Sequence, residues 1–446
     1  MTTATDKRPL AVIVGLGRTG LSAARYLRAQ GWRLAVTDTR AQPPELAALT
    51  ALDAAIAVRT GTLDASLLEG ALCVVASPGV PLSSPFFAAA RARGLEIVGD
   101  IELFARAADA PVAGVTGTNG KSTVTTLLAR MAQRAGIAVR VGGNLGEPAL
   151  DLLSPEAALY VLELSSFQLE TTTGLACRAA TVLNVSADHL DRYASIGAYA
   201  AAKARIFARC DTAVVNLDDP WVSAMPRAAR RTLSFSLRAA VGADYAVAQH
   251  QGGWWLTHRG APLLPVASLR IKGLHNAANA LAALALGEAL ELPRAAMLDE
   301  LREFPGLPHR SQWVAERRGV TYVNDSKGTN VGATLAAVGG MAGPLVMIAG
   351  GDGKNQDFAP LAAAFRGKVR HAVLIGRDAP LLARALAGVC TLETCATLPE
   401  AVQAAARAAR PGDTVLLSPA CASLDMFRDY TQRGAVFTQA VMELAA

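Results

Sequence analysis

Short apolar runs that end in Gly, Asp or Ser alternate with Ala-rich stretches along most of this chain. In the first hundred residues the apolar runs lie at 10–14, 34–37, 72–76 and 95–98. Short apolar runs separated by helical patterns are typical of parallel strands joined by crossover helices. The alternation therefore predicts an α/β protein built on parallel, doubly wound sheets.

The alternation falls into three blocks, and a chain of 446 residues is long enough for about two to four domains. Later apolar runs lie at 112–115, 159–164, 181–185, 321–324, 345–349, 372–375 and 414–418. Between about residues 212 and 269 the pattern changes, and the runs 244–249 and 254–257 indicate antiparallel hairpins. An Ala-rich helix is expected from His275 towards Glu291. Pro and Gly residues at 305–308 then interrupt the chain, so we predict three domains at 1–99, 100–306 and 307–446.

The composition is that of a folded protein with a sizeable core, since 52% of residues are hydrophobic and 18% are charged. The net charge of +6 is spread along the chain and never forms a block of five basic residues. This favours anionic small molecules over nucleic acid as ligands. The same excess of positive charge would arise in an evolutionary lineage that prefers Arg at solvent-exposed positions, whatever the ligand.

The six cysteines contain no pair at C-x-x-C spacing, which argues against a zinc ribbon or a redox pair. Scattered cysteines in a long chain fit a reducing compartment. The N-terminal residues are polar and charged, and the apolar run after them is too short for a signal segment. No long uncharged apolar run follows, so we expect a cytoplasmic protein without membrane insertion.

A G-x-G-x-x-G fingerprint, Gly15, Gly17 and Gly20, follows the first apolar run and opens a helix. Such glycines let the backbone approach a pyrophosphate at a helix N-terminus. Asp38 ends the second run, where a ribose-binding acid is expected. Taken alone, the fingerprint indicates NAD, although another nucleotide diphosphate would fit, and a tight turn that binds nothing would share the spacing.

A second phosphate-binding motif lies in the segment Gly-Val-Thr-Gly-Thr-Asn-Gly-Lys-Ser-Thr at 114–123. Its Gly-Lys-Ser core is intact, although Val115 stands where the strict motif has its first Gly. Lys121 would contact the β- and γ-phosphates of ATP, and a hydroxyl would reach Mg²⁺. A plain dehydrogenase has no use for a γ-phosphate. The two motifs together favour an enzyme that activates one substrate and transfers it.

Polar side chains follow the next two strands of the second block. Glu163 ends one strand, and Asp188 and His189 come just after another. Because the carboxyl ends of parallel strands meet at one edge of a sheet, these groups should converge on the phosphate loop. A carboxylate and an imidazole beside a phosphate site suggest Mg²⁺ ligation. A lone His would more often be structural.

Lys203 lies on the apolar stripe of the helix expected at 196–207, four residues after Tyr199 and four before Phe207. Burial lowers the pKa of a Lys and exposes a neutral amine. A neutral amine can react with CO₂ to give a carbamate, which is an oxygen ligand for a metal. Periodicity alone favours the alternative, a Lys at the edge of the stripe whose ammonium reaches water.

Three polar clusters follow strands of the third block, at 324–330, 350–354 and 418–425. Lys354 and Ser423 would hold an anionic small substrate, and Asp325 would hold a ribose. Loops between helices and strands are ordinarily rich in Gly, Asp and Ser, which would account for any one cluster but less easily for all three.

The motifs of all three blocks together resemble those of the Mur ligases. The resemblance rests on Gly117-Thr-Asn-Gly-Lys-Ser122, Asp188-His-Leu-Asp-Arg192, Gly273-Leu-His-Asn276, Leu307-Pro-His-Arg310, Asn324-Asp-Ser-Lys327, Gly350-Gly-Asp-Gly-Lys354 and Ser418-Pro-Ala-Cys-Ala-Ser423. The last three resemble the members that add D-glutamate. The Asp-Asn-Pro-Arg motif of the members that add diaminopimelate or lysine is absent.

The resemblance implies a Rossmann-like first domain, a central ATPase domain of the P-loop type and a Rossmann-like third domain. The residues implied to bind the UDP substrate are Gly17, Arg18, Thr19, Asp38, Thr39, Arg40, Ser77 and Gly79, with Asn144 and Gln168 at its muramoyl part. Those implied for ATP are Gly117, Thr118, Asn119, Gly120, Lys121, Ser122, Thr123, Asn276, Arg310 and Asp325. Those implied for D-glutamate are Thr329, Lys354, Ser423, Leu424 and Tyr430.

The implied reaction is the ATP-dependent addition of D-glutamate to UDP-N-acetylmuramoyl-L-alanine through an acyl phosphate, in peptidoglycan precursor synthesis. Ser122, Glu163, His189 and a carbamylated Lys203 would hold two Mg²⁺ ions, and Lys121 would assist phosphoryl transfer. We expect the protein to be a monomer. We also expect its third domain to close on the other two, because an acyl phosphate must be kept from water.

Two alternatives remain at this point. A sister ligase, such as a folylpolyglutamate synthetase or another Mur enzyme, shares the phosphate loop and the Lys. The third-block motifs and a first domain of the UDP-binding type argue against it. A nicotinamide oxidoreductase or a nucleotide-sensing module is the second alternative, and titration with NADH would distinguish it.

Overall fold

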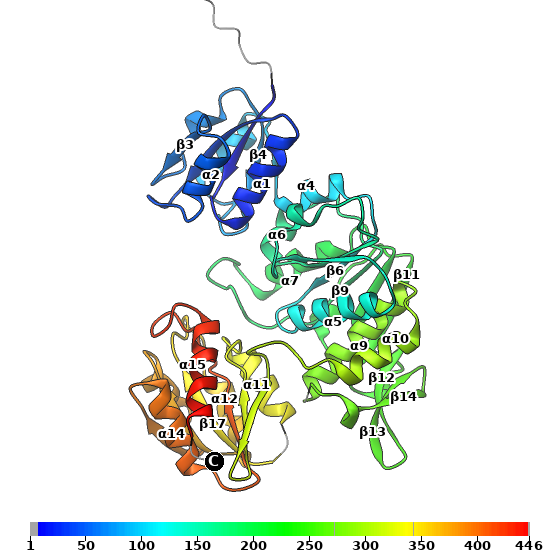
Figure 1. The fold of residues 1–446 in the computed structure, drawn as a ribbon, viewed down its shortest axis with the longest axis vertical. Helices are drawn as coiled ribbons and strands as arrows, with labels where there is room; N and C mark the ends of the chain where they lie inside the picture. Colours follow the sequence, from blue (N-terminus) through cyan, green and yellow to red (C-terminus); the bar gives the residue numbers. More distant parts are fainter. Residues whose placement is uncertain (1–7, 272, 342, 445–446) are drawn as a thin grey trace, which may run out of the picture.

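The computed structural model of the protein describes residues 8–271, 273–341 and 343–444. The polar residues 1–7, on which the expectation about a signal segment rests, lie outside the described residues. In the described part, the strands form three sheets that follow one another along the chain (Figure 1). All three are largely parallel, so the predicted α/β class is confirmed.

The first sheet has five parallel strands in the order β3-β2-β1-β4-β5. Its elements are β1 (Leu10–Val14), α1 (Arg18–Ala29), β2 (Arg33–Asp38), α2 (Leu46–Leu52), β3 (Ala57–Thr60), β4 (Ala71–Ala76), α3 (Pro85–Ala92) and β5 (Glu96–Val98). The chain order reverses between β1 and β4, and ligands of such sheets bind at the carboxyl ends of the strands at this point. The apolar runs locate four strands to within one residue. They miss β3, an edge strand whose residues are mostly exposed.

The second sheet has nine strands in the order β14-β13-β12-β11-β10-β9-β6-β8-β7. Its strands are β6 (Val112–Thr116), β7 (Val139–Gly143), β8 (Leu159–Glu163), β9 (Ala179–Val182), β10 (Thr212–Asn216), β11 (Arg231–Ser236), β12 (Tyr245–His250), β13 (Gly253–His258) and β14 (Ala261–Pro265). The predicted hairpin is present as the antiparallel pair β12–β13. The change of pattern expected from about residue 212 does not begin there, because β10 and β11 extend the parallel sheet.

Burial explains why β10 joins the parallel part of the sheet. Val214 packs into one hydrophobic core, while Ala213 and Val215 on the opposite face pack into another. A strand covered on both faces reads as a continuous apolar run, as parallel strands do. Antiparallel pairing begins only where Gly252 and Gly253 allow a tight turn.

Seven helices among the described residues accompany the second sheet. They are α4 (Asp100–Ala107), α5 (Lys121–Arg134), α6 (Ser166–Glu170), α7 (Ile196–Ala204), α8 (Pro220–Ser223), α9 (Leu274–Ala289) and α10 (Arg294–Glu303). The Ala-rich α9 is the predicted helix, and it is buried over most of its circumference because its small side chains let it pack closely against α5 and the sheet. The helix expected at 196–207 ends at Ala204 and continues as a 3₁₀ turn, Arg205–Phe207.

The third sheet has the order β15-β16-β20-β17-β18-β19, and only β15 runs antiparallel to its neighbour. Its elements are β15 (Gln312–Arg317), β16 (Val320–Asn324), α11 (Val331–Gly340), β17 (Leu345–Gly350), α12 (Ala359–Phe365), β18 (Val369–Ile375), α13 (Ala379–Ala385), β19 (Thr391–Thr394), α14 (Leu398–Ala408), β20 (Thr414–Leu417) and α15 (Tyr430–Met442). Two hydrophobic cores lie on its faces, one under α11–α13 and one under α14 and α15.

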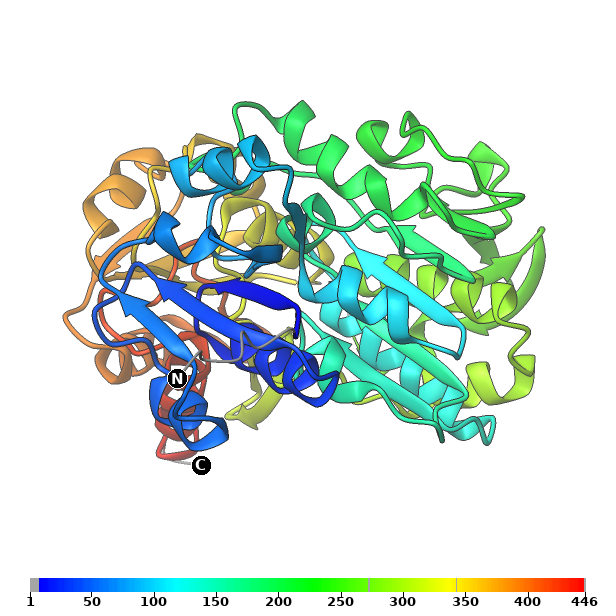
Figure 2. The ribbon, with the colours of Figure 1, turned by 90° about the horizontal axis from the view of Figure 1, so that it is seen from above.

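The first and third sheets lie on the same side of the second, as both views show (Figures 1 and 2). Helices make the contacts between the domains: α1 packs against the 3₁₀ turn Ala149–Leu152 and against α4, and α11 packs against α9. None of the described helices is both long and apolar enough to cross a membrane.

Candidate active site

A cavity of about 540 Å³ lies between the first and second sheets. All ten residues predicted to contact the UDP substrate line it: Gly17, Arg18, Thr19, Asp38, Thr39, Arg40, Ser77, Gly79, Asn144 and Gln168. Two glycines of the fingerprint, Gly15 and Gly17, also line it. A Cβ atom at Gly20 would lie 2.1 Å from the carbonyl oxygen of Gly15, so the close strand–helix turn requires glycine there.

Asp38 holds the rim of this cavity in place. Its carboxylate accepts hydrogen bonds from the Leu16 amide at 2.6 Å and from the Arg40 guanidinium at 2.6 and 2.9 Å. Burial raises the pKa of Asp38, but the hydrogen bonds from Arg40 and Leu16 outweigh burial and lower it to about 2. The carboxylate is therefore charged at neutral pH and keeps Arg40 beside the cavity.

Asn144 and Gln168 connect this cavity to the central sheet. The Asn144 amide donates to Oε1 of Glu163 at 2.7 Å. The Gln168 amide donates to the buried Asp100 at 3.1 Å, and its oxygen accepts from the Ser165 amide as part of the capping box of α6. Both predicted muramoyl contacts thus have fixed side chains, and Asn144 links the cavity directly to Glu163.

The segment between β6 and α5, here called the phosphate loop, has the strand–loop–helix geometry expected of such a motif. Its backbone is left-handed at Gly120, with a φ of 86°, and a Cβ atom there would lie 2.5 Å from Oδ1 of Asn279. The next loop holds it from the other side, because the Thr118 and Asn119 amides donate to the carbonyl and side-chain oxygens of Asn184, at 2.9 and 2.8 Å. Glycine is therefore a steric requirement at this turn.

Two lysines, the half-buried Lys121 and the buried Lys203, share one acceptor in this loop. The Nζ atoms of Lys121 and Lys203 each donate to the carbonyl oxygen of Gly117 at 2.9 Å. Lys203 is only 1% exposed, so the alternative in which its ammonium reaches water is wrong. Burial, and then the charge of Lys121, bring the pKa of Lys203 well below its usual value. A neutral amine is favoured at this position.

Glu163, His189 and Ser122 surround the same loop. Oε2 of Glu163 is buried and has no hydrogen-bond partner among the described residues, which suits a cation ligand. The His189 backbone is left-handed, with a φ of 54°, and its ring packs edge-on against Phe167. Burial lowers the pKa of His189, so its imidazole is neutral, as metal ligation requires. Within the described ranges, no three His, Cys, Asp or Glu side chains form a metal-binding cluster.

A second cavity, of about 320 Å³, lies between the second and third sheets. Six of the ten residues predicted for ATP line it: Asn119, Gly120, Thr123, Asn276, Arg310 and Asp325. Arg310 donates to the hydroxyl of Ser122 at 2.7 Å, so the third sheet already contacts the phosphate loop. Asp325 accepts from the Ser311 amide and the Ser418 hydroxyl, and burial raises its pKa to about 6.

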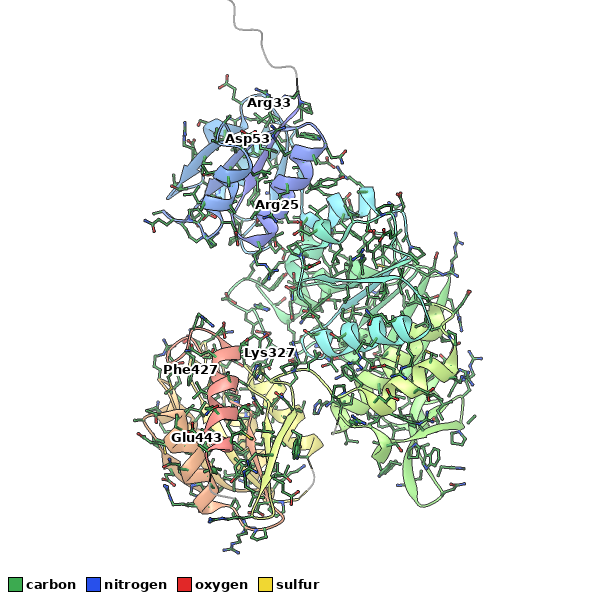
Figure 3. All side chains as sticks on the ribbon, in the orientation of Figure 1. Arg25, Arg33, Asp53, Lys327, Phe427 and Glu443 are labelled. Atoms are coloured by element: carbon green, nitrogen blue, oxygen red, sulfur yellow. The ribbon has the colours of Figure 1, made fainter. Side chains whose placement is uncertain are left out.

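Lys327 is a residue of this cavity to which the sequence analysis assigned no role. Burial, together with the charges of Arg310 and Lys121, lowers the pKa of Lys327 to about 8. Its Nζ lies 4.0 Å from the centroid of the Tyr430 ring, and Figure 3 shows it on the side of the third domain that faces the second. Its position in the same motif as Asp325 was the signal that could have identified it.

Four residues predicted for D-glutamate lie in loops at the carboxyl ends of the third sheet: Thr329, Lys354, Ser423 and Leu424. The fifth, Tyr430, begins α15, and none of the five lines either cavity. Paired hydrogen bonds between Asp352 and Ala422, at 3.0 and 2.7 Å, join the loops that carry Lys354 and Ser423. Ser423 is buried, whereas Lys354 is exposed and Leu424 is 70% exposed. The loops are adjacent, and two of the side chains that they carry, Lys354 and Leu424, are open to solvent.

Arg433 on α15 fastens the same loops and was not anticipated from sequence. It is 1% exposed and donates to the carbonyl oxygens of Ser326, Cys421 and Ala422 at 2.8, 3.1 and 3.3 Å. Burial lowers its pKa to about 10. An arginine inside a helix carries no motif of its own, which is why the sequence does not reveal it.

Comparisons with known proteins cover nearly the whole chain. Family models match the Mur ligase MurD-like N-terminal domain at residues 10–99, the Mur ligase middle domain at 115–287 and the Mur ligase glutamate ligase domain at 309–421. A UDP-N-acetylmuramoylalanine–D-glutamate ligase of Methylobacillus flagellatus is 53% identical over 444 residues, 98% of this chain and 97% of that protein. One of Pseudomonas aeruginosa is 51% identical over 438 residues, 97% of this chain and 98% of that protein.

The chain belongs to the Mur ligase family. Solved Mur ligases share its fold. UDP-N-acetylmuramate-alanine ligase MurC of Thermotoga maritima has a TM-score of 0.61 at 19% identity and covers 97% of this chain and 99% of its own. MurF of Acinetobacter baumannii has a TM-score of 0.61 at 18% identity, and its alignment spans 96% of this chain and 90% of the MurF chain. At these identities the likeness concerns the fold alone.

The match decides between the readings that the sequence left open. The resemblance to Mur ligases is confirmed, and the first domain of this Mur ligase matches a MurD-like model over residues 10–99. Its glycine fingerprint therefore belongs to a ligase, and the alternative that the protein is a nicotinamide oxidoreductase is excluded. The curated relatives at about half identity are D-glutamate ligases, which removes the folylpolyglutamate synthetase.

Proposed function

We propose that this Mur ligase uses ATP to join D-glutamate to UDP-N-acetylmuramoyl-L-alanine in the cytoplasm, as a monomer, during peptidoglycan precursor synthesis. The observation that carries the proposal is the position of the phosphate loop between two cavities, with Asn144 joining the first cavity to Glu163 and Arg310 joining the second to Ser122. One cavity suits a long nucleotide-sugar and the other suits ATP. Relatives that span the whole chain carry the matching name.

Three domains divide the work in this proposal: residues 1–99 bind the UDP substrate, 100–306 bind ATP, and 307–446 bind D-glutamate. The fingerprint helix α1 offers its N-terminus to the diphosphate. The muramoyl part then extends past Asn144 and Gln168 towards Glu163. This direction brings the substrate carboxylate to the phosphate loop, where it must react.

In the first step, an oxygen of the substrate carboxylate attacks the γ-phosphorus of ATP, the bond to the bridging oxygen breaks, and ADP leaves. Lys121 at the start of α5 faces the developing charge, together with the helix N-terminus. Arg310 is within reach of the same phosphates because it already bonds Ser122. Asn276 and Asp325 line the cavity where the nucleoside would lie.

The described residues fit a hard cation beside the phosphates. Ser122 and Glu163 would hold one Mg²⁺, and Glu163, His189 and a carbamate on Lys203 would hold another. When bound, these ions would neutralise charge on the transferred phosphoryl group. The carbamate is supported by the burial of the Lys203 amine beside the phosphate loop and by the lowering of its pKa, which burial causes and which favours the neutral form.

In the second step, the neutral amine of D-glutamate attacks the acyl phosphate carbon, and phosphate leaves as the amide forms and the nitrogen loses a proton. Lys354, Ser423, Thr329, Leu424 and Tyr430 would hold D-glutamate. Lys354 and Ser423 would contact its carboxylates. Their loops are already joined by the Asp352–Ala422 pair, so a small rearrangement would close the pocket.

The test is phosphate release from ATP with UDP-N-acetylmuramoyl-L-alanine and a panel of amino acids. We expect release that requires both the UDP substrate and D-glutamate. Release with a different amino acid would retain ligation but contradict the assignment of the third domain. Absence of release with every amino acid would contradict the proposal as a whole.

A further inference from the structure

Arg192 reaches from the loop that carries His189 into the first domain. Its Nη1 donates to the carbonyl oxygen of Pro78 at 2.8 Å, and its Nη2 lies 3.5 Å from that of Val80. Pro78 and Val80 flank Gly79 on the loop after β4, and all three line the cavity assigned to the UDP substrate. One side chain of the central domain thus fixes one wall of a cavity that the first domain largely forms.

The other side of the Arg192 guanidinium is bound within the central domain. It pairs with the Glu170 carboxylate at 3.0 Å and lies over the Phe167 ring, 4.2 Å from its centroid. Phe167 also contacts the His189 ring, at a centroid distance of 4.9 Å and an interplanar angle of 68°. Phe167 therefore touches both Arg192 and His189, and both Phe167 and Glu170 belong to α6.

This chain of contacts is tightly held. Arg192 is 13% exposed, so a shift of the loop at residues 77–80 would break its bonds to the carbonyl groups of Pro78 and Val80 or would pull the guanidinium from Phe167. His189 is sensitive to such a shift, because its backbone is left-handed and its carbonyl oxygen accepts a hydrogen bond from the Arg192 amide at 3.0 Å. A planar guanidinium can serve two carbonyls, a carboxylate and a ring face together, whereas a lysine ammonium cannot.

We propose that Arg192 is a positioning residue that couples occupancy of the first-domain cavity to the orientation of His189 beside the phosphate loop. The inference rests on the proposed function, since it names the UDP substrate and ATP as the two coupled ligands. Binding of either ligand then favours binding of the other, because coupling between two sites is reciprocal. His189 reaches its working orientation when the UDP substrate holds the loop at residues 77–80 in place.

The matched control is Arg205, which also donates to two backbone carbonyls, those of Leu169 at 2.6 Å and Thr172 at 3.0 Å. Both of its acceptors lie in the central domain, so Arg205→Lys removes a similar pair of bonds without touching the first domain. The test variant is Arg192→Lys. A second test variant, Glu170→Gln, keeps the size of its side chain and removes its charge, and it weakens the hold on Arg192 without changing Arg192 itself.

The experiment is calorimetric titration of the full-length protein, with thermal denaturation to establish that each variant is folded. UDP-N-acetylmuramoyl-L-alanine is titrated without nucleotide or metal. A non-hydrolysable ATP analogue with Mg²⁺ is then titrated with and without saturating UDP substrate. In the wild type we expect the UDP substrate to tighten binding of the analogue by about fivefold or more. The measured quantity is the ratio of the Kd of the analogue without the UDP substrate to its Kd with it. In Arg192→Lys we expect this ratio to fall towards one, and binding of the UDP substrate alone to weaken by roughly five- to tenfold.

Arg205→Lys should keep the wild-type ratio, and Glu170→Gln should give an intermediate one. A wild-type ratio near one, or an undiminished ratio in folded Arg192→Lys, overturns the inference while leaving the proposed function intact. If Arg192→Lys does not fold, an undiminished ratio in Glu170→Gln overturns it. Failure of the wild type to bind the UDP substrate at all would instead overturn the proposed function.

Discussion

At the scale of single residues, the carbonyl oxygen of Gly117 accepts hydrogen bonds from two lysines with different tasks. Lys121 must stay charged to meet phosphate, and its ammonium also bonds the Thr118 carbonyl. Lys203 has the Gly117 carbonyl and the face of the Tyr199 ring beside its Nζ. With two ammonium groups this close, the more deeply buried one loses its proton first, and that is Lys203.

Replacement of Lys203 by Met should therefore lower kcat by about 100-fold or more, because a group that stabilises the transferred phosphoryl charge is lost. Added short-chain carboxylates should restore part of the rate by supplying the oxygen ligand that the carbamate would provide. Phosphate release measures both effects. Lys368→Met is the control, since Lys368 lies beside a surface cavity lined only by third-domain residues. Wild-type kcat in Lys203→Met would contradict the role of Lys203.

The pH dependence of activity should report Lys327. Its pKa of about 8 lies below the usual value, so its positive charge is present below pH 8 and is lost as the pH rises through 8. We expect kcat/KM for ATP to fall above about pH 8 in the wild type. Lys327→Arg should move this fall to higher pH, because a guanidinium keeps its proton. If kcat/KM for ATP fell at the same pH in both proteins, Lys327 would be excluded as the group whose deprotonation causes the fall.

At the scale of elements, the strand–loop–helix junctions contribute most to the site. The carboxyl ends of β1 and β4 form the first cavity, and the β6–α5 junction forms the phosphate loop. Strand order brings these junctions together: β6 lies between β8 and β9, so Glu163 at the end of β8 and Asn184 after β9 flank the loop. Apolar runs identify the strands, but they do not reveal this order.

Gly120→Ala should disrupt the β6–α5 junction. The added Cβ would lie 2.5 Å from Oδ1 of Asn279, so we expect ATP binding to weaken by about 10- to 100-fold. Gly136→Ala is a matched control, because Gly136 also has a positive φ but nothing within 4 Å of its would-be Cβ. It should cost about 1 kcal/mol of folding stability and leave ATP binding unchanged. Equal losses of binding in both variants would mean that backbone strain, not the contact with Asn279, is responsible.

At the scale of the whole molecule, both outer domains contact the central one close to the phosphate loop. Arg192 joins the first domain to it, and Arg310 joins the third. The third domain makes a further contact where Asn330 donates to Asp188 at 3.4 Å. The residues assigned to D-glutamate are still partly open to solvent, so exclusion of water from an acyl phosphate requires further closure.

We expect the radius of gyration in X-ray scattering to fall when an ATP analogue and the UDP substrate are both present. Arg310→Ala should reduce this compaction, because the third domain loses its bond to Ser122. Either ligand alone should have a smaller effect. An unchanged radius with both ligands bound would show that the third domain does not close, and D-glutamate would then have to bind the open arrangement.

Much of this protein could be read from its sequence because the information is local. Apolar runs locate the main strands, and glycines mark the turns that need a close approach. The ten residues that line one cavity were instead implied for the UDP substrate by the resemblance to the Mur ligases. Exposed or edge strands such as β3 and β19 were not predicted, because their short sequences lack a continuous apolar run. The parallel pairing of β10 with β11 was not predicted either, since periodicity does not identify the partner of a strand.

Only the tertiary structure decided what depends on contacts between distant residues. The burial of Lys203, on which periodicity gave the wrong preference, follows from packing of α7 against the phosphate loop. The lowered pKa of Lys327 and the contacts of Arg192 and Arg433 arise where several loops meet. Residue type and spacing determine which chemistry a chain can perform. Desolvation and charge proximity, which set protonation states and couple the domains, exist only after the chain has folded.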